Sequence, residues 1–433
     1  MTPAKTQFSL PDDFNPETLM VAKVTEFGVF HEVRRAAHLA ADLVANGAPA
    51  DLDLAEQILA QVLDRQEHDP ADPHHGNFYW MREDEFVEDL NAVEFVLEAL
   101  IPMMIRHAAR LTPALQERLL AAIKLGLMEV ARLDVLVAYT NIAALGVLNT
   151  CLGGELLQTP EIATRGFGKL LAWIDYTNRS GHPLEYNSPT YTAVTLRSLK
   201  LLTDLTADAP TRQAARALTA RLGLSAALHI HSGTGRWAGP HGRAYQPTIV
   251  CETAPEVERL RAWLTDGTLP RWLASFVDRP MASFSIQETA ERSRGIALTT
   301  HQTPTFALGV ASQSFHPQAN VLMLHYARPN APRPGVLYSR YLLDDKWFGD
   351  AYHATDRTKM LNLPDEGRFL GVQEVNRAIG LYAQIGADHF ASAKGVLIWT
   401  GRDEIDEIWV GEECITELPH RLDVDQAVVV ARR

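Results

Sequence analysis

The densest group of polar and aromatic side chains lies in residues 181–191, which read GHPLEYNSPTY. Ser188 followed by Pro189 is typical of a helix start, because Ser caps free N–H groups and Pro fits the first turn. The side chains able to do chemistry are Glu185, Tyr186 and Asn187 before this helix and Tyr191 in its first turn. A helix N-terminus favours a bound carboxylate. The segment is therefore a candidate site for an acidic ligand; the alternative is a capped helix start with a packed tyrosine.

A second candidate is residues 235–245, GRWAGPHGRAY, a loop shaped by Gly and Pro. It supplies Trp237, His241, Arg243 and Tyr245. Arg binds a carboxylate through two parallel hydrogen bonds, His and Tyr transfer protons, and aromatic faces suit sugar rings. The alternative is an interdomain loop held by structural hydrogen bonds. Because functional residues concentrate on loops that a rigid scaffold holds, we favour a site.

Two further segments are weaker candidates. Tyr139 and Asn141 stand at a predicted helix start, and Asn149 follows two turns later on about the same face. An Asn can stabilise developing negative charge on a substrate carboxylate, although a buried Asn bonded to a neighbouring helix explains the pattern equally well. Residues 78–80, Phe-Tyr-Trp, could stack on a sugar through Trp80, or belong to the core.

Other chemistries receive less support. His229 and His231, with His241 further on, could supply zinc ligands, but this spacing is not specific. The sequence contains neither a phosphate-binding Gly-rich loop ending in Lys-Ser or Lys-Thr nor a Gly-x-Ser-x-Gly motif. We therefore expect no metal and no cofactor, and we do not favour nucleotide hydrolysis or serine hydrolase chemistry.

The elements that position these residues change type along the chain. In the first half, apolar residues recur at three-and-four spacing, which predicts helices joined by short connections as antiparallel hairpins. The runs are 29–45, 52–63, 90–104, 112–127, 140–156, 160–176, 190–205 and 210–228. The segment 231–280 is a mixed connector with a helical piece at 255–265.

After about residue 280, short β-branched and aromatic runs separated by Pro, Gly, Asn and Asp predict strands. They begin near residues 295, 305, 321, 335, 377, 395, 407 and 427. The predicted fold class is α+β and multidomain: an incomplete (α/α) toroid of helical hairpins over 1–250, a helical connector over 251–280 and an antiparallel β-sandwich over 281–433.

Composition narrows the functional class. The 433 residues are 46% hydrophobic and 21% charged, which is ordinary for a globular protein. The net charge of −13 argues against nucleic acid as a partner.

No apolar run is long enough for a membrane span, and the N-terminus lacks a signal-peptide pattern, so we expect no membrane partner and a cytoplasmic location. Three distant cysteines (Cys151, Cys251 and Cys414) fit a reducing compartment. Homo-oligomerisation is left open.

The order of elements resembles the helical-toroid plus β-sandwich polysaccharide lyases, in the heparinase II/III-like and alginate-lyase-like group. The resemblance rests on Tyr139-Thr-Asn141 and on the segments 181–191 and 235–245. The His that commonly follows the neutralising Asn is absent here, where Asn141 precedes Ile142. Members of that group use a Tyr as proton acceptor and donor and neutralise a uronate carboxylate with Asn, His, Arg or Glu.

The resemblance implies a lyase that performs β-elimination on a uronate-containing oligosaccharide. It implies Tyr191 or Tyr245 as the acid/base, with Asn141, Asn187, His241 and Arg243 around the carboxylate. We add Glu185 to the catalytic set and place Tyr139, Tyr186, Trp237, Trp80 and Asn149 among substrate-binding residues.

Two other functions stay open. A glycoside hydrolase would need two carboxylates across the same cleft, for which Glu185 with Asp89 or Glu94 are the candidates. A non-catalytic carbohydrate-binding protein would keep the aromatic residues without a tuned Tyr or Arg. A dehydratase or cyclase on a small substrate is a related enzymatic alternative, since fold does not fix function.

Overall fold

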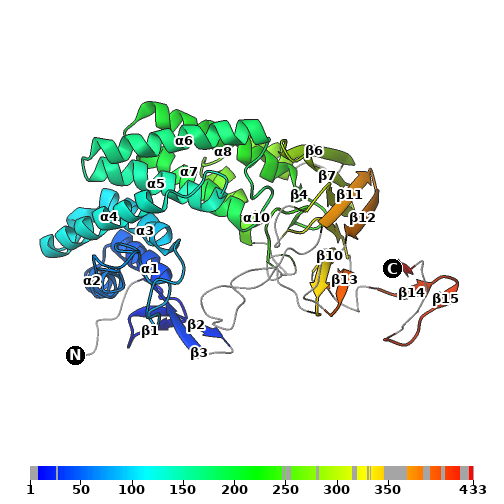
Figure 1. The fold of residues 1–433 in the computed structure, drawn as a ribbon, viewed down its shortest axis with the longest axis horizontal. Helices are drawn as coiled ribbons and strands as arrows, with labels where there is room; N and C mark the ends of the chain where they lie inside the picture. The colour runs from blue at the N-terminus through cyan, green and yellow to red at the C-terminus, as the bar shows by residue number, and fades with distance from the viewer. Residues whose placement is uncertain are drawn as a thin grey trace.

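The fold class predicted from the sequence, α+β, is confirmed: helices fill the first part of the chain and antiparallel strands the last (Figure 1). The computed structural model describes residues 8–25, 28–245, 249, 255–278, 282–314, 319–328, 331, 333–345, 368–383, 391–400, 405–419 and 429–432. Within these ranges, no helix is both long and apolar enough to cross a membrane. Cys151 and Cys414 form no disulfide, and Cys251 lies outside the described residues.

The helical part consists of two rows of helices. The first row is α1 (Val33–Asn46), α3 (Ala92–His107), α5 (Thr140–Leu156) and α7 (Tyr191–Leu205), in which each helix packs against the next. The second row is α2 (Pro49–Leu63), α4 (Pro113–Leu133), α6 (Pro160–Ser180) and α8 (Ala209–Leu228), each packed on the helix that precedes it in the chain. The hairpins predicted from periodicity are thus present, and each helix of the second row has Pro in its first turn.

Helix α5 lies at the centre of this arrangement. It is buried on every side from Thr140 to Gly154, which explains why its sequence lacks a polar face. Its glycines allow close packing: a Cβ at Gly154 would lie 2.3 Å from the backbone nitrogen of Ala163 in α6. The position of α5 matters because its first residues hold a carboxylate of the candidate site.

Shorter elements flank the two rows. Before α1, the strands β1 (Phe14–Asn15), β2 (Met20–Thr25) and β3 (Gly28–Glu32) form a small antiparallel sheet. The 3-10 helix η1 (Ala108–Arg110) follows α3. After α8 come the hairpin β4 (Ile230–His231) and β5 (Arg236–Trp237), then α10 (Pro255–Thr265), η2 (Arg271–Leu273) and α11 (Ala274–Val277). The helical piece expected at 255–265 corresponds to α10.

The C-terminal region contains a six-stranded antiparallel sheet in the order β13-β10-β9-β8-β7-β6. Its strands are β6 (Phe284–Glu291), β7 (Ile296–Gln302), β8 (Phe306–Ala311), β9 (Leu322–Tyr326), β10 (Gly335–Leu343) and β13 (Ala393–Trp399). A ribbon of β11 (Arg368–Glu374) and β12 (Arg377–Ala383) contacts β8, and β14 (Glu407–Val410), β15 (Glu413–Cys414) and β16 (Val429–Arg432) form a further small sheet.

The helical part and the six-stranded sheet meet at the two segments that the sequence marked. Gly181, at the end of α6, pairs with Glu291 of β6, and His241 pairs with Asn320, just before β9. The Thr300 hydroxyl of β7 donates to the Gly239 carbonyl at 2.8 Å. Both candidate segments therefore lie at the boundary between helices and sheet.

Candidate functional site

The loop between α6 and α7, residues 181–190 (the Glu185 loop), is shaped by two residues with positive φ, Gly181 at 107° and Asn187 at 44°. Its end is fixed by Ser188, whose hydroxyl accepts from the Tyr191 backbone N–H at 3.1 Å and donates to the carbonyl of Arg243. Tyr191 is the first residue of α7, in agreement with its predicted place in the first turn. The loop thus joins Tyr191 to the second candidate segment.

Four predicted residues meet in one hydrogen-bonded network. The Arg243 guanidinium donates to Glu185 Oε1 at 2.8 Å through Nη1 and to the Tyr245 hydroxyl at 3.2 Å through Nη2. The hydroxyls of Tyr191 and Tyr245 lie 2.5 Å apart, and Arg243 Cζ lies 4.2 Å from the centre of the Tyr191 ring. Tyr139 also hydrogen-bonds Arg243. We call these five residues, Tyr139, Glu185, Tyr191, Arg243 and Tyr245, the tyrosine–arginine cluster.

The Glu185 carboxylate is held at the N-terminus of α5. Its Oε2 accepts from the Asn141 backbone N–H at 2.9 Å, and the Glu185 backbone N–H donates to Thr140 Oγ1 at 3.2 Å. Burial raises the pKa of Glu185, while the Arg243 charge and these hydrogen bonds favour the ionised form. The positive end of the α5 dipole acts in the same direction as Arg243.

Burial raises the pKa of two tyrosines of the cluster. It raises the pKa of Tyr191 well above its ordinary value, against the opposing influence of Arg243, and it also raises the pKa of Tyr139. The Tyr245 oxygen is the one that receives the Arg243 hydrogen bond and stands next to the Tyr191 hydroxyl. By geometry, Tyr245 is the better placed of the two for proton transfer, with Tyr191 as its hydrogen-bond partner.

Solvent reaches the cluster at Tyr139, which is more exposed than Arg243 or Glu185. Tyr139 is 36% exposed, whereas the side chains of Arg243 and Glu185 are 12% and 7% exposed. The Asn141 carboxamide, beside Glu185, has a buried oxygen without a hydrogen-bond partner in the described part of the chain. An unpaired buried acceptor is costly, so this oxygen suits a hydrogen-bond donor of a ligand, such as a hydroxyl group.

A family model described as a domain of unknown function (DUF8769) matches residues 9–253, more than half of the chain. The chain belongs to this family. No curated protein matches it. The matched region contains both candidate segments and Tyr139, and so every residue of the tyrosine–arginine cluster, whereas strands β6 to β16 lie outside it.

Three other predicted residues of the DUF8769 region build the scaffold of the cluster instead of joining it. The Asn187 amide donates to the carbonyls of Ala238 at 2.8 Å and Pro240 at 2.9 Å, and its oxygen accepts from Trp237 Nε1 at 2.5 Å. His241 is buried with Nε2 3.1 Å from the Trp237 carbonyl, and burial lowers its pKa to about 3, so its ring is neutral. Asn187 and His241, predicted to lie around the carboxylate, and Trp237, predicted to bind substrate, are thus hydrogen-bonded to one another or to nearby backbone and do not join the cluster.

The remaining predicted substrate-binding residues are packed in the interior. Tyr186 lies in the apolar core of the sheet, and Trp80 packs edge-on against Phe95 with the Arg34 guanidinium over its ring. The Asn149 amide donates to the Glu94 carbonyl at 2.9 Å. These contacts correspond to the structural alternatives that the sequence left open.

The two carboxylates that a hydrolase could pair with Glu185 have structural surroundings of their own. Glu94 is 1% exposed, and burial raises its pKa to about 8, while Asp89 accepts hydrogen bonds from Asn91. Asp89 exerts an electrostatic influence on Tyr139 of the cluster.

The described residues contain no group of three His, Cys, Asp or Glu side chains that could hold a metal. The histidines of the zinc alternative bind the protein itself: His229 Nδ1 lies 2.9 Å from the Ser225 carbonyl, and His231 contacts Thr234 and Thr303.

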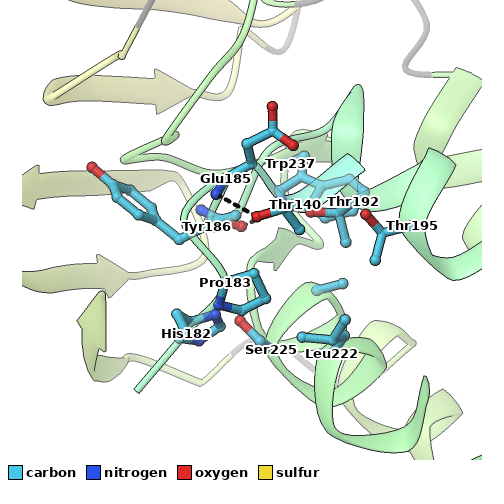
Figure 2. A pocket seen from close by; sticks show the side chains of 12 residues that line it. Thr140, His182, Pro183, Glu185, Tyr186, Thr192, Thr195, Leu222, Ser225 and Trp237 are labelled. Carbon is cyan, nitrogen blue, oxygen red and sulfur yellow. Dashed lines mark hydrogen bonds between the residues drawn. The ribbon is translucent and has the colours of Figure 1, made fainter. Parts of the chain in front are cut away.

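A small cavity lies beneath the Glu185 loop (Figure 2). Its volume of about 20 Å³ holds a single water molecule. Figure 2 shows Glu185 and Thr140 at one end of the cavity and His182 and Pro183 at the other. Sequence reasoning did not single out His182, whose partner Glu288 lies on β6.

Proposed function

We propose that this protein is a carbohydrate-active lyase that performs β-elimination on a uronate-containing oligosaccharide. The observation that carries the proposal is the Tyr245 hydroxyl, which accepts from Arg243 and adjoins the Tyr191 hydroxyl. The two rows of helices followed by an antiparallel sheet are compatible with the toroid and sandwich architecture of the lyases that the sequence resembles. In this proposal the helices form an incomplete toroid.

The chemistry requires removal of a weakly acidic proton. A proton alpha to a carboxylate becomes removable when positioned donors stabilise the enolate that develops. Arg243 and the Asn141 carboxamide are the groups proposed to face the substrate carboxylate. Arg243 already pairs with Glu185, so an incoming carboxylate shares this cation, and the Asn141 side-chain N–H₂ is the second donor in this proposal.

Tyr245 is the proposed acid and base. As a phenolate held by Arg243 and Tyr191, its oxygen takes the proton alpha to the carboxylate. The C–H electron pair forms the new C=C bond, the bond to the 4-O-linked sugar breaks, and Tyr245 returns the proton to the leaving oxygen. Because one residue takes and returns the proton, the step needs neither a metal nor an external oxidant.

The test is a panel of acidic oligosaccharides monitored by ultraviolet absorbance, because a conjugated unsaturated uronate absorbs where the substrate does not. We expect absorbance to increase with wild-type protein and not with Tyr245→Phe. New reducing ends without absorbance would instead show a glycoside hydrolase, and binding without any product would show a non-catalytic sugar-binding protein; either result overturns the proposal.

A further inference from the structure

The start of the Glu185 loop is attached to strand β6. The Arg292 backbone N–H, just after β6, donates to the Ser180 carbonyl at 2.8 Å, and Gly181 pairs with Glu291. A Cβ at Gly181 would lie 2.4 Å from the Thr289 carbonyl oxygen, so only glycine permits this approach. The loop that carries Glu185 therefore begins on the sheet and ends on the segment that carries Arg243.

One ion pair reinforces this attachment. His182 Nε2 lies 3.1 Å from Glu288 Oε1, and the two side chains are 12% and 16% exposed. The Ser225 hydroxyl of α8 donates to Glu288 Oε2 at 3.2 Å. Both members line a cavity of about 360 Å³, through which water can reach them. Pro183 follows His182 and restricts the backbone between it and Glu185.

We propose that the His182–Glu288 ion pair is a pH-dependent positioning contact for the candidate site, which holds the Glu185 loop on β6 while His182 carries a proton. The positioning role rests on the proposed function, because it gives Glu185 and Tyr191 their catalytic importance. His182 is a positioning residue, since it acts through the loop and not on substrate.

The carboxylate of this pair is charged throughout the physiological pH range. Although burial raises the pKa of Glu288, His182, His229 and Ser225 hold it down to about 2, so this carboxylate is ionised at all physiological pH values. His229 lies 3.8 Å from Glu288 Oε2, and burial lowers its pKa. Histidine ordinarily changes charge between about pH 5 and 8.

Two other charged side chains at this boundary, Arg221 and Glu291, form hydrogen bonds with other partners. Arg221 of α8 donates to the carbonyls of Thr177 and Gly181 and to Asn178 Oδ1. Glu291 of β6 accepts from the Tyr176 hydroxyl at 3.2 Å and from Ser293, and Arg292 lies at the rim of the cavity. None of these side chains hydrogen-bonds His182 in the described part of the chain.

The experiment is hydrogen exchange of the peptide spanning residues 181–191, measured between pH 5.5 and 8 and corrected for intrinsic exchange. In the wild type we expect protection to fall about fivefold as pH rises. Glu288→Gln should give low, pH-independent protection. His182→Lys, with a permanent charge, should keep high protection throughout. Tyr176→Phe, which removes a different bond between α6 and β6, should behave as the wild type.

Equal pH dependence in the wild type and Glu288→Gln would overturn the proposal, as would pH-dependent protection in His182→Lys. Exchange of peptides in α4 verifies that each variant is folded. Because the measurement needs no substrate, it can fail while lyase activity is present, or succeed while activity is absent. The two proposals are therefore tested separately.

Discussion

The hydroxyl of Tyr191 lies 2.5 Å from the hydroxyl of Tyr245, although the two residues come from the first turn of α7 and from the loop after β5. The pair is asymmetric. Arg243 donates a hydrogen bond to the Tyr245 oxygen, whereas it places its guanidinium over the Tyr191 ring. The two tyrosines therefore differ in what their loss would remove.

Replacing the tyrosines by Phe should separate their roles. Tyr245→Phe removes the proposed proton acceptor and should lower kcat by about 10²- to 10⁴-fold. Tyr191→Phe removes a supporting hydrogen bond and should lower kcat by about tenfold. The assay is turnover of an acidic oligosaccharide that the wild type cleaves, with circular dichroism to verify folding. Full activity in both variants would exclude tyrosine-based elimination.

Substitutions at Arg243 and Glu185 should have non-additive effects on the free energy of unfolding. Arg243→Met leaves the buried Glu185 carboxylate without its cation and should lower the free energy of unfolding by about 3 kcal/mol. Adding Glu185→Gln removes the charge and should recover a large part of this loss. Urea unfolding measures both. The control is Arg179→Met, which breaks an exposed ion pair with Asp175 and should cost less than about 0.5 kcal/mol.

Asn187 should matter for stability. Asn187→Ala removes the hydrogen bonds to Ala238 and Pro240 and puts Ala at a φ of 44°, so we expect a loss of about 2 kcal/mol or more. Glycine adopts this φ without strain, so the loss for Asn187→Gly should be smaller than that for Asn187→Ala by about 1 kcal/mol. Thermal unfolding compares the two. Equal loss would show that backbone strain contributes nothing here.

The sequence predicted the helical hairpins, the strand runs and all five residues of the cluster, with Tyr139 among the substrate-binding residues. Periodicity and turn residues are local signals, and Glu185, Tyr191, Arg243 and Tyr245 lie in segments that such signals mark. The sequence alone does not show which polar side chains make structural hydrogen bonds and are therefore not free to bind a ligand. Asn187 is one example, because its partners lie about fifty residues away.

Glu288 is the opposite case, a residue with a proposed role that the sequence did not mark. It is one polar residue among several on β6, and nothing local distinguishes it. Its importance comes from the approach of His182 in the Glu185 loop and of Ser225 in α8. Contacts between the helices and the sheet depend on how these elements pack, which neither spacing nor composition encodes.

Two glycines of α6 should respond oppositely to the same substitution. A Cβ at Gly166 would lie 2.6 Å from the backbone nitrogen of Cys151 in α5, so Gly166→Ala should separate the helices and cost about 1–3 kcal/mol. Nothing lies within 4 Å of a Cβ at Gly168, which is exposed, so Gly168→Ala should stabilise the protein by up to about 1 kcal/mol. Urea unfolding tests both. A neutral Gly166→Ala would contradict the close packing of α5 on α6.

Buried histidines should make the protein sensitive to acid. Burial lowers the pKa of His241 to about 3, and it also lowers the pKa of His229 and of His325. The unfolded chain binds protons at these sites below about pH 6.5, where the folded chain does not. Stability is therefore complete above that pH and declines as the pH falls, by up to about 1.4 kcal/mol per pH unit for each histidine.

Urea unfolding at a series of pH values from 7.5 to 5 measures this slope. His241→Gln removes one of the three groups and should reduce the slope by about one proton, even if it lowers stability at every pH. Below about pH 4.5 the protonation of Glu288 adds a second decline, because its folded pKa of about 2 lies below its ordinary value. A free energy of unfolding that stays constant from pH 7.5 to 5 would mean that these histidines are hydrated and protonated in the folded protein, against their burial beside the loop that carries Arg243.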